Sequence, residues 1–136
     1  MKFLAIVCIS CLGLASCQTM HQFLSPSQDW QARNGQLLYR GRKTALIGEV
    51  LVRYSNKGDF ELTFTKGPGI ALLEVRQDAN FVRVSGPLAR GSWSGPTAQA
   101  PARLRGWVEL RELLMASGNQ TSVQHSAGGD KFIFRF

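Results

Sequence analysis

The fold is decided by eight residues in the middle of the chain, Asp59-Phe60-Glu61-Leu62-Thr63-Phe64-Thr65-Lys66. Phe60, Leu62 and Phe64 alternate with polar residues, which is the period of a strand with one buried and one solvated face. The next residues, Gly67-Pro68-Gly69, fit a type II turn, because proline presets φ at the first central position and glycine accepts a positive φ at the second. The run therefore predicts one strand of an antiparallel sheet.

Further strands are expected on both sides of this run. Period-two alternation or a short apolar run bounded by turn residues predicts strands at 36–40, 44–54, 70–76, 81–85 and 131–136. Turn residues at 55–58 and 77–80 separate neighbouring strands. The pattern is typical of the mainly β (α+β) class, with a curved antiparallel sheet or incomplete barrel.

Two helices are expected beside the sheet. Ser25-Pro26-Ser27-Gln28 has the residues of a capping box with proline at the first helical position, and predicts a short N-terminal helix that carries Trp30 and ends at Asn34-Gly35. Residues 102–116 have apolar side chains at spacings of three and four, which predicts one helix across the open face of the sheet. Residues 86–101 are expected to form a surface loop, and 117–130 a polar connection.

The N-terminus has the features of a secretory leader. Lys2 precedes an apolar region of twelve residues, Phe3 to Leu14, which is too short to span a bilayer, and small residues then lead into Cys17. Leu14-Ala15-Ser16-Cys17 resembles the lipobox of bacterial lipoproteins. The resemblance implies that 1–16 is a signal peptide and that Cys17 is acylated. The alternative is an ordinary signal peptide with an incidental Cys17.

This resemblance also implies where the protein works. Residues 17–25 would be a lipidated tether and 26–136 a single β-rich domain attached to the membrane by its lipid. Lipoproteins of this class are sorted by the residue after cysteine, where Asp retains them in the inner membrane. Gln18 stands there in this chain. We therefore expect a cell-envelope location, lipid-anchored in the outer membrane and facing the periplasm.

The charge of the chain favours acidic partners. Sixteen Lys and Arg against nine Asp and Glu give a formal net charge of +7, and in an envelope protein the expected partners are anionic head groups rather than nucleic acid. Four arginines, Arg53, Arg76, Arg83 and Arg135, fall on strands opposite the predicted core. They are either an ordinary solvated face or a patch that orients the domain against lipid phosphates.

The residues that usually carry catalysis are sparse. His21 falls in the expected tether and His125 in the expected polar connection, so neither has partners at metal-ligand spacing. Gly91-Ser92-Trp93-Ser94-Gly95 has tryptophan where a nucleophile elbow requires serine. We therefore expect a protein that is not an enzyme and has no cofactor and no metal site.

Several segments of the domain resemble the LolB-like outer-membrane lipoprotein receptors. They are Gly41-Arg42, the strand Phe60 to Phe64, the Gly67-Pro68-Gly69 turn into Ala71-Leu72-Leu73-Glu74-Val75, and Leu104-Arg105-Gly106-Trp107-Val108. The resemblance implies an incomplete barrel whose cavity accepts acyl chains of other lipoproteins, without enzymatic activity. It also implies a membrane-facing apolar residue after the turn, for which Ile70 is the candidate. The family has several strands after the helix, whereas this chain has residues for about one.

Together these features predict a lipoprotein that binds an acyl chain or another hydrophobic ligand on the concave face of its sheet, in lipid or lipoprotein trafficking. The expected lining consists of Phe60, Leu62, Phe64, Leu73, Val75 and Trp107. The alternative is a structural lipoprotein that docks onto a larger envelope complex. In that case its own side chains fill the space beneath the helix and leave no ligand cavity.

Overall fold

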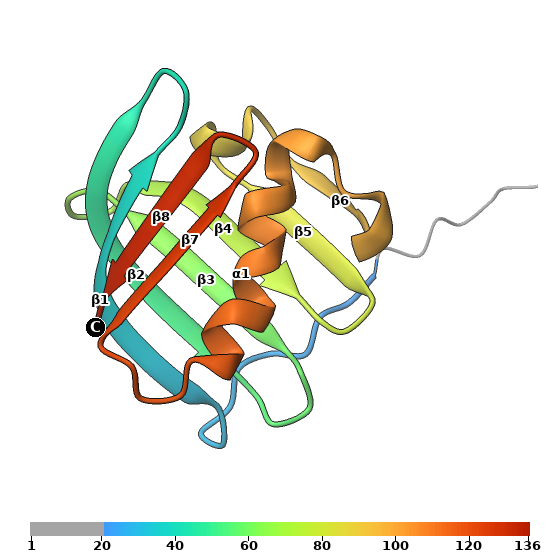
Figure 1. The fold of residues 1–136 in the computed structure, drawn as a ribbon. Helices are drawn as coiled ribbons and strands as arrows, with labels where there is room; N and C mark the ends of the chain where they lie inside the picture. The colour runs from blue at the N-terminus through green and yellow to red at the C-terminus, as the bar shows by residue number, and fades with distance from the viewer. Residues whose placement is uncertain (1–20) are drawn as a thin grey trace, which may run out of the picture.

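Eight antiparallel strands form one curved sheet in the computed structural model, which describes residues 21–136 (Figure 1). In chain order they are β1 (Gln31–Arg40), β2 (Ala45–Tyr54), β3 (Phe60–Thr65), β4 (Ala71–Gln77), β5 (Phe81–Ser85), β6 (Trp93–Pro96), β7 (Ser122–Ala127) and β8 (Asp130–Arg135). One α-helix, α1 (Arg105–Ala116), lies between β6 and β7 in this part of the chain. Three short 3-10 turns, η1 (Pro87–Ala89), η2 (Thr97–Gln99) and η3 (Ala102–Leu104), precede it. The predicted leader, 1–16, and Cys17 lie outside the described residues.

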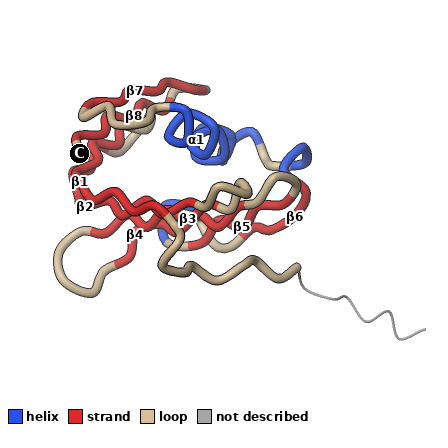
Figure 2. The backbone as a smooth tube through the Cα atoms, turned by 90° about the horizontal axis from the view of Figure 1, so that it is seen from below, coloured by secondary structure: helices blue, strands red, loops and turns tan. Residues whose placement is uncertain are grey.

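The strands are ordered β6-β5-β4-β3-β2-β1-β8-β7. Strands β1 to β6 form a meander in which each pairs with the next. The chain then crosses through α1, and the final hairpin returns so that β8 pairs with β1, with Gln36 opposite Arg135. Because β6 and β7 do not pair with each other, the sheet stays open. Helix α1 lies across the open side, facing the concave surface of the sheet (Figure 2).

The space between the sheet and α1 holds the hydrophobic core. Alternate residues of each strand point inward, as in β3, where Phe60, Leu62 and Phe64 are buried and their neighbours are partly exposed. The helix contributes Trp107, Val108, Leu110 and Leu114, and Phe132 and Phe134 come from β8. These observations confirm the mainly β class, the curved unclosed sheet and the helix over 102–116, whose first turn is η3.

The predicted N-terminal helix is wrong. Residues 21–27 have no regular secondary structure, 28–30 form a turn with a bond from Trp30 N–H to Ser27 O (3.1 Å), and β1 begins at Gln31. The local capping signals are overridden because all ten residues of β1 pair with β2. Gly35 lies inside this strand. A Cβ there would overlap the carbonyl oxygen of Arg135, so its glycine permits close approach of β8 and does not end a helix.

Two edge strands were also not predicted. The expected surface loop 86–101 contains β6, which pairs with β5 through Val84 and Trp93. The expected polar connection 117–130 contains β7, so two strands follow the helix where one was expected. Both strands are at the margin of the sheet, where one side has no partner strand and polar residues are tolerated.

Candidate functional site

The six residues expected to line a ligand site come together on the concave side. Phe64 is opposite Leu73 and Leu62 is opposite Val75 on neighbouring strands, and Phe60 lies on the same face of β3. Trp107 covers them from α1, with its ring 6.2 Å from that of Phe64. The structure therefore places these side chains on one apolar surface, as the alternation predicts.

The same residues are fully buried. None of the six is more than 2% exposed. The Trp107 ring also lies 4.9 Å from that of Tyr39 and 4.8 Å, edge to face, from that of Phe132. A Cβ on Gly106 would lie 2.9 Å from the Phe132 ring, so α1 approaches β8 closely. A ligand can therefore reach this surface only if α1 moves away from it.

Ile70 is prominently exposed. It follows the β3–β4 turn and is 57% accessible to solvent. The turn is closed by a bond from Lys66 N–H to Ile70 O (3.0 Å), and positive φ values of 68° and 76° at Gly67 and Gly69 let the chain reverse. In Figure 2 this loop projects on the side of the sheet opposite α1. An apolar side chain thus stands free on the outer face.

Most of the arginines on the outer face are engaged within the protein. Arg53 pairs with Glu61, and Arg76 lies 3.6 Å from the same carboxylate. Arg83 lies over the Phe23 ring, 5.3 Å from its centre. Of the four arginines considered in the sequence, only Arg135 has no such ion pair or aromatic contact among the described residues. These contacts support the interpretation of an ordinary outer face for this set.

The N-terminal segment packs on the outer face of β4 and β5. His21 Nε2 lies 2.6 Å from Asp78 Oδ2, and the imidazole stacks on the Phe81 ring at 4.2 Å. Arg76 donates to the carbonyl oxygen of Leu24 (3.1 Å). Residues 21–24 of the expected tether are therefore held against the sheet.

Asp78 is the polar centre of this contact. Burial alone would raise the pKa of its carboxyl group. Hydrogen bonds from the backbone N–H of Asn80, from His21 and from the N–H of Phe81 outweigh that effect and hold the pKa below the usual 3.8. The carboxylate is thus stabilised in its charged form, in which it holds the β4–β5 turn and the N-terminal segment.

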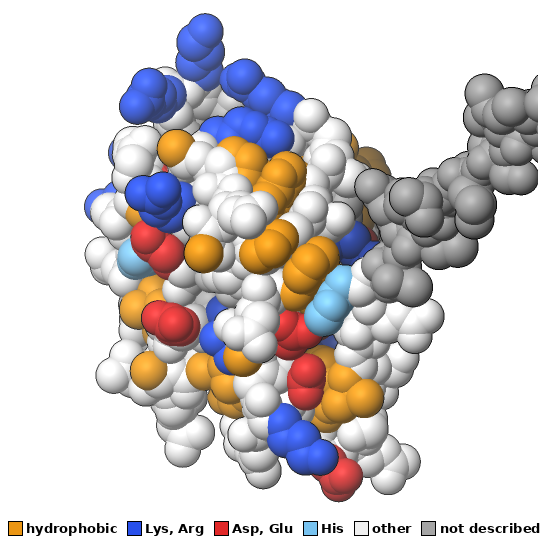
Figure 3. Space-filling model, turned by 90° about the vertical axis from the view of Figure 1, so that its right-hand side faces the viewer, with side chains coloured by type: hydrophobic (Ala, Val, Ile, Leu, Met, Phe, Trp, Pro, Cys, Tyr) orange, Lys and Arg blue, Asp and Glu red, His pale blue; other side chains and the backbone are white. Residues whose placement is uncertain are grey.

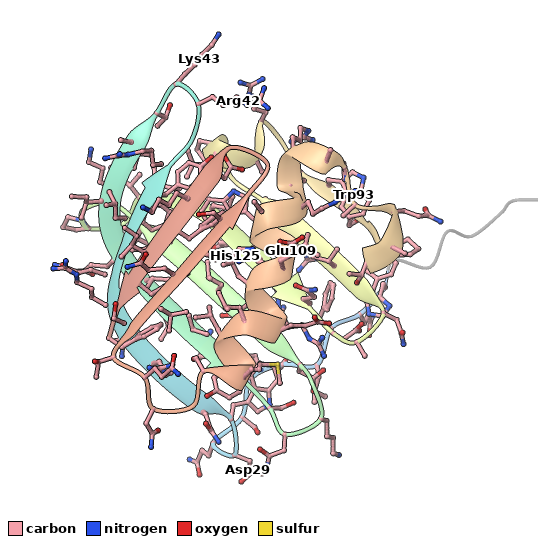
Figure 4. All side chains as sticks on the ribbon, in the orientation of Figure 1. Asp29, Arg42, Lys43, Trp93, Glu109 and His125 are labelled. Atoms are coloured by element: carbon pink, nitrogen blue, oxygen red, sulfur yellow. The ribbon has the colours of Figure 1, made fainter. Side chains whose placement is uncertain are left out.

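A second imidazole–carboxylate pair links α1 to β7. His125 Nε2 lies 2.7 Å from Glu109 Oε2, and the two side chains face each other in Figure 4. The His125 ring also packs along Phe132, 6.1 Å between centres. The pair therefore connects the helix to the edge strand. Within residues 21–136, no three His, Cys, Asp or Glu side chains gather as a metal ion would require.

No protein-family model and no curated protein matches this chain. None of the helices within the described residues is long and apolar enough to cross a membrane.

Proposed function

We propose that this chain is a lipid-anchored envelope lipoprotein without enzymatic activity that binds an acyl chain between α1 and the concave face of its sheet. Its place is the outer membrane, facing the periplasm, in lipid or lipoprotein trafficking. The observation that carries the proposal is an apolar sheet interior whose open side is covered by α1. The lipobox ending at Cys17 supplies the anchor.

An acyl chain that displaced α1 from the sheet would gain about as much burial energy as α1 lost. Five buried side chains cover the sheet from η3 and α1: Leu104, Trp107, Val108, Leu110 and Leu114. At about 1.5–3 kcal/mol each, their burial contributes roughly 8–15 kcal/mol. An acyl chain of about 15 methylene groups gains about 12 kcal/mol when it is buried. A single chain can therefore replace most of the contacts that α1 gives up.

Trp107 is a reporter placed at the centre of the proposed site. Phenylalanine at Trp30 and Trp93 leaves it as the sole tryptophan. We expect a brominated fatty acid to quench Trp107 in the unacylated chain, residues 18–136, in a saturable manner. The matched control keeps Trp93 and replaces the other two with phenylalanine, and it should not be quenched. Equal or unsaturable quenching of the two proteins would contradict acyl binding on the concave face.

A covalent lock tests whether α1 must move. The Cβ position of Gly106 lies 3.5 Å from Ala127 Cβ, at the short end of the disulfide range. The double variant Gly106→Cys/Ala127→Cys should lose fatty-acid uptake when oxidised and regain it when reduced. Gly106→Cys alone controls for crowding of Phe132. Uptake that is the same in both redox states would show that α1 does not control access.

A docking lipoprotein is the second candidate. It is favoured by the burial of all six predicted lining residues to 2% exposure or less, because a core already filled by its own side chains needs no ligand. In that case Trp107 is not quenched, and a partner of the envelope co-purifies at a fixed stoichiometry from detergent.

A further inference from the structure

An apolar row crosses the outer face of the sheet over β2, β1 and β8. Leu38 of β1 is directly opposite Ile47 of β2 on one side and Ile133 of β8 on the other. All three point away from the core, because Leu37, Phe132 and Phe134 beside them are buried. Ile47 is 62% exposed. The outer face of an antiparallel sheet is normally polar, so this row requires an explanation.

Cations flank this row on one side. Arg40 and Lys131 are opposite each other one step toward the β1–β2 hairpin, and Lys43 lies at the tip of that hairpin. None of the three forms an ion pair within the described residues. Lys43 points away from the protein in Figure 4, and Figure 3 shows Lys and Arg gathered at this end of the molecule.

A shallow hollow joins the two kinds of side chain. It has a volume of about 150 Å³ and is lined by Leu38, Ile133, Arg40 and Lys131. We call these four residues, with Ile47 and Lys43, the hairpin patch. On the side of Ile47 away from the hairpin, the next outward residue of β2 is Glu49. Asp130, next to Lys131 in the chain, accepts a hydrogen bond from the Tyr39 hydroxyl group, 3.1 Å away. Arg135 lies next to the row on the opposite side, also without an ion pair among the described residues, so three of these four outward cations are at the hairpin end.

Ile70 extends the hairpin patch. Glu49 of β2 is opposite Thr65, the last residue of β3, so the β3–β4 turn lies next to the part of β2 that carries Ile47. Leu24 also lies on the outer face, where Arg76 binds its carbonyl oxygen. These are the large apolar side chains that are most exposed in the described chain, at 55–62%. Ile47 faces outward with Leu38, and the β3–β4 turn that precedes Ile70 projects on the side of the sheet opposite α1 (Figure 2).

We infer that the hairpin patch and Ile70 rest directly on an anionic phospholipid bilayer. Ile47 and Ile70 enter the boundary between head groups and acyl chains, and Arg40, Lys43 and Lys131 bind lipid phosphates. Helix α1 and the concave face then point away from this surface. The inference rests on the proposed membrane anchor and adds the orientation of the domain.

Charge complementarity favours a bilayer over a second copy of the chain. In a two-fold symmetric dimer the same patch contacts itself, so the unpaired cations of one copy would oppose those of the other. An anionic bilayer supplies phosphates to each cation and an apolar layer for the isoleucines. The N-terminal segment also lies on the outer face, with His21 on β5 only four positions after Cys17.

A fluorescent label at position 47 tests the inference. The acylated mature chain, which begins at the lipid-bearing Cys17 and has no other cysteine, carries Ile47→Cys with an environment-sensitive dye. It is reconstituted in vesicles of phosphatidylcholine alone or with one third phosphatidylglycerol. We expect a blue shift and quenching by spin-labelled lipid in the anionic vesicles. The matched label replaces Lys57, an exposed cation in the β2–β3 turn at the far end of β2, and should remain as in water.

Charge reversal gives the second readout. With the unacylated chain, residues 18–136, Arg40→Glu/Lys43→Glu should weaken binding to the anionic vesicles at least about tenfold, because each basic residue near such a surface contributes about 1 kcal/mol. Lys57→Glu should have little effect.

A label at 47 that is as exposed to water as the label at 57 would overturn the inference, as would unchanged binding after charge reversal. A blue shift at 47 without vesicles would indicate a second copy and would overturn it too. Mass analysis of Cys17 and quenching of Trp107 test the anchor and the acyl site separately, so failure of the proposed function is recognised independently.

Discussion

Replacing Gly35 by alanine should destabilise the seam between the meander and the C-terminal hairpin. The added Cβ would overlap the carbonyl oxygen of Arg135 and lie 3.0 Å from Phe136 Cα, and both are backbone atoms that cannot rotate away. Overpacking of this kind costs about 1–3 kcal/mol, whereas the lower chain entropy of alanine in the unfolded state returns about 0.4–1 kcal/mol. The end of the chain can yield, so we expect a net loss of about 1–2 kcal/mol.

The loss should appear in thermal unfolding followed by circular dichroism. At roughly 4 °C per kcal/mol for a domain of this size, the Tm of Gly35→Ala should fall by about 4–8 °C. Gly95→Ala is the matched control, because its new Cβ meets only the partly exposed Trp93 ring, at 3.1 Å. We expect a shift below about 3 °C for it. A Tm for Gly35→Ala equal to that of the parent, or to that of Gly95→Ala, would refute the close-approach argument.

Three further outcomes are expected. Burial and the neighbouring Asp130 carboxylate raise the pKa of Tyr39 to about 12, so the phenol should ionise only near that pH in an ultraviolet titration, and Asp130→Asn should lower the pKa. The free energy of unfolding that this shift contributes should be fully present below pH 10 and fall as the pH rises toward 12. The pKa of Asp78 is lowered, so the stability that its carboxylate contributes should be complete above pH 3.8 and fall below that pH. Backbone hydrogen exchange at residues 21–24 should therefore rise below pH 3.8. In His21→Ala, where the segment is already released, the same acidification should cause no further rise. Arg111→Met removes the bond that ties α1 to the β2–β3 turn (2.9 Å) and should therefore strengthen fatty-acid binding, measured by quenching of Trp107, whereas weaker binding would contradict an exchange between α1 and the ligand.

The central strands and the helix could be predicted because their sequence patterns agree with their environment. Residues 59–66 were expected as a strand, and β3 spans Phe60–Thr65. The apolar spacing of 102–116 predicted the helix that α1 and η3 form. In each case one face is buried, so the apolar residues recur with the period of the strand or the helix. The six concave-face residues were found in the same way.

The edges could not be predicted from such patterns. In β7 only Val123 is buried, and His125 is partly covered by Glu109 and Phe132, so the strand shows no apolar alternation. β6 has four residues and ends at Pro96. The N-terminal helix failed for a different reason. Its capping residues are a local signal, and the pairing of β1 with β2 and β8, which decides the outcome, depends on residues up to a hundred positions away.

The hairpin patch has a signal of its own in the sequence. Leu37-Leu38 and Leu46-Ile47 are adjacent apolar pairs, and in a strand one member of each pair must face outward. The register then aligns the outward members with Ile133. Two adjacent apolar residues in an otherwise alternating strand therefore indicate an apolar position on the outer face of the sheet. The sequence alone does not give the strand register, which decides whether such positions lie side by side.

The open sheet gives the two apolar surfaces different physical roles. On the concave side, α1 is held by side-chain burial of roughly 8–15 kcal/mol and by surface polar bonds such as His125–Glu109, each of which contributes about 1 kcal/mol. Affinity for an acyl chain is therefore a difference between two large apolar terms, and small changes in α1 can shift it strongly. On the outer face, Ile47 and Ile70 have no such competitor, because more than half of each residue's surface is already open to solvent. Contact with a bilayer there requires no rearrangement, whereas ligand entry beneath α1 does. Under the proposed function, the domain therefore keeps its orientation at the membrane while α1 opens and closes over the ligand.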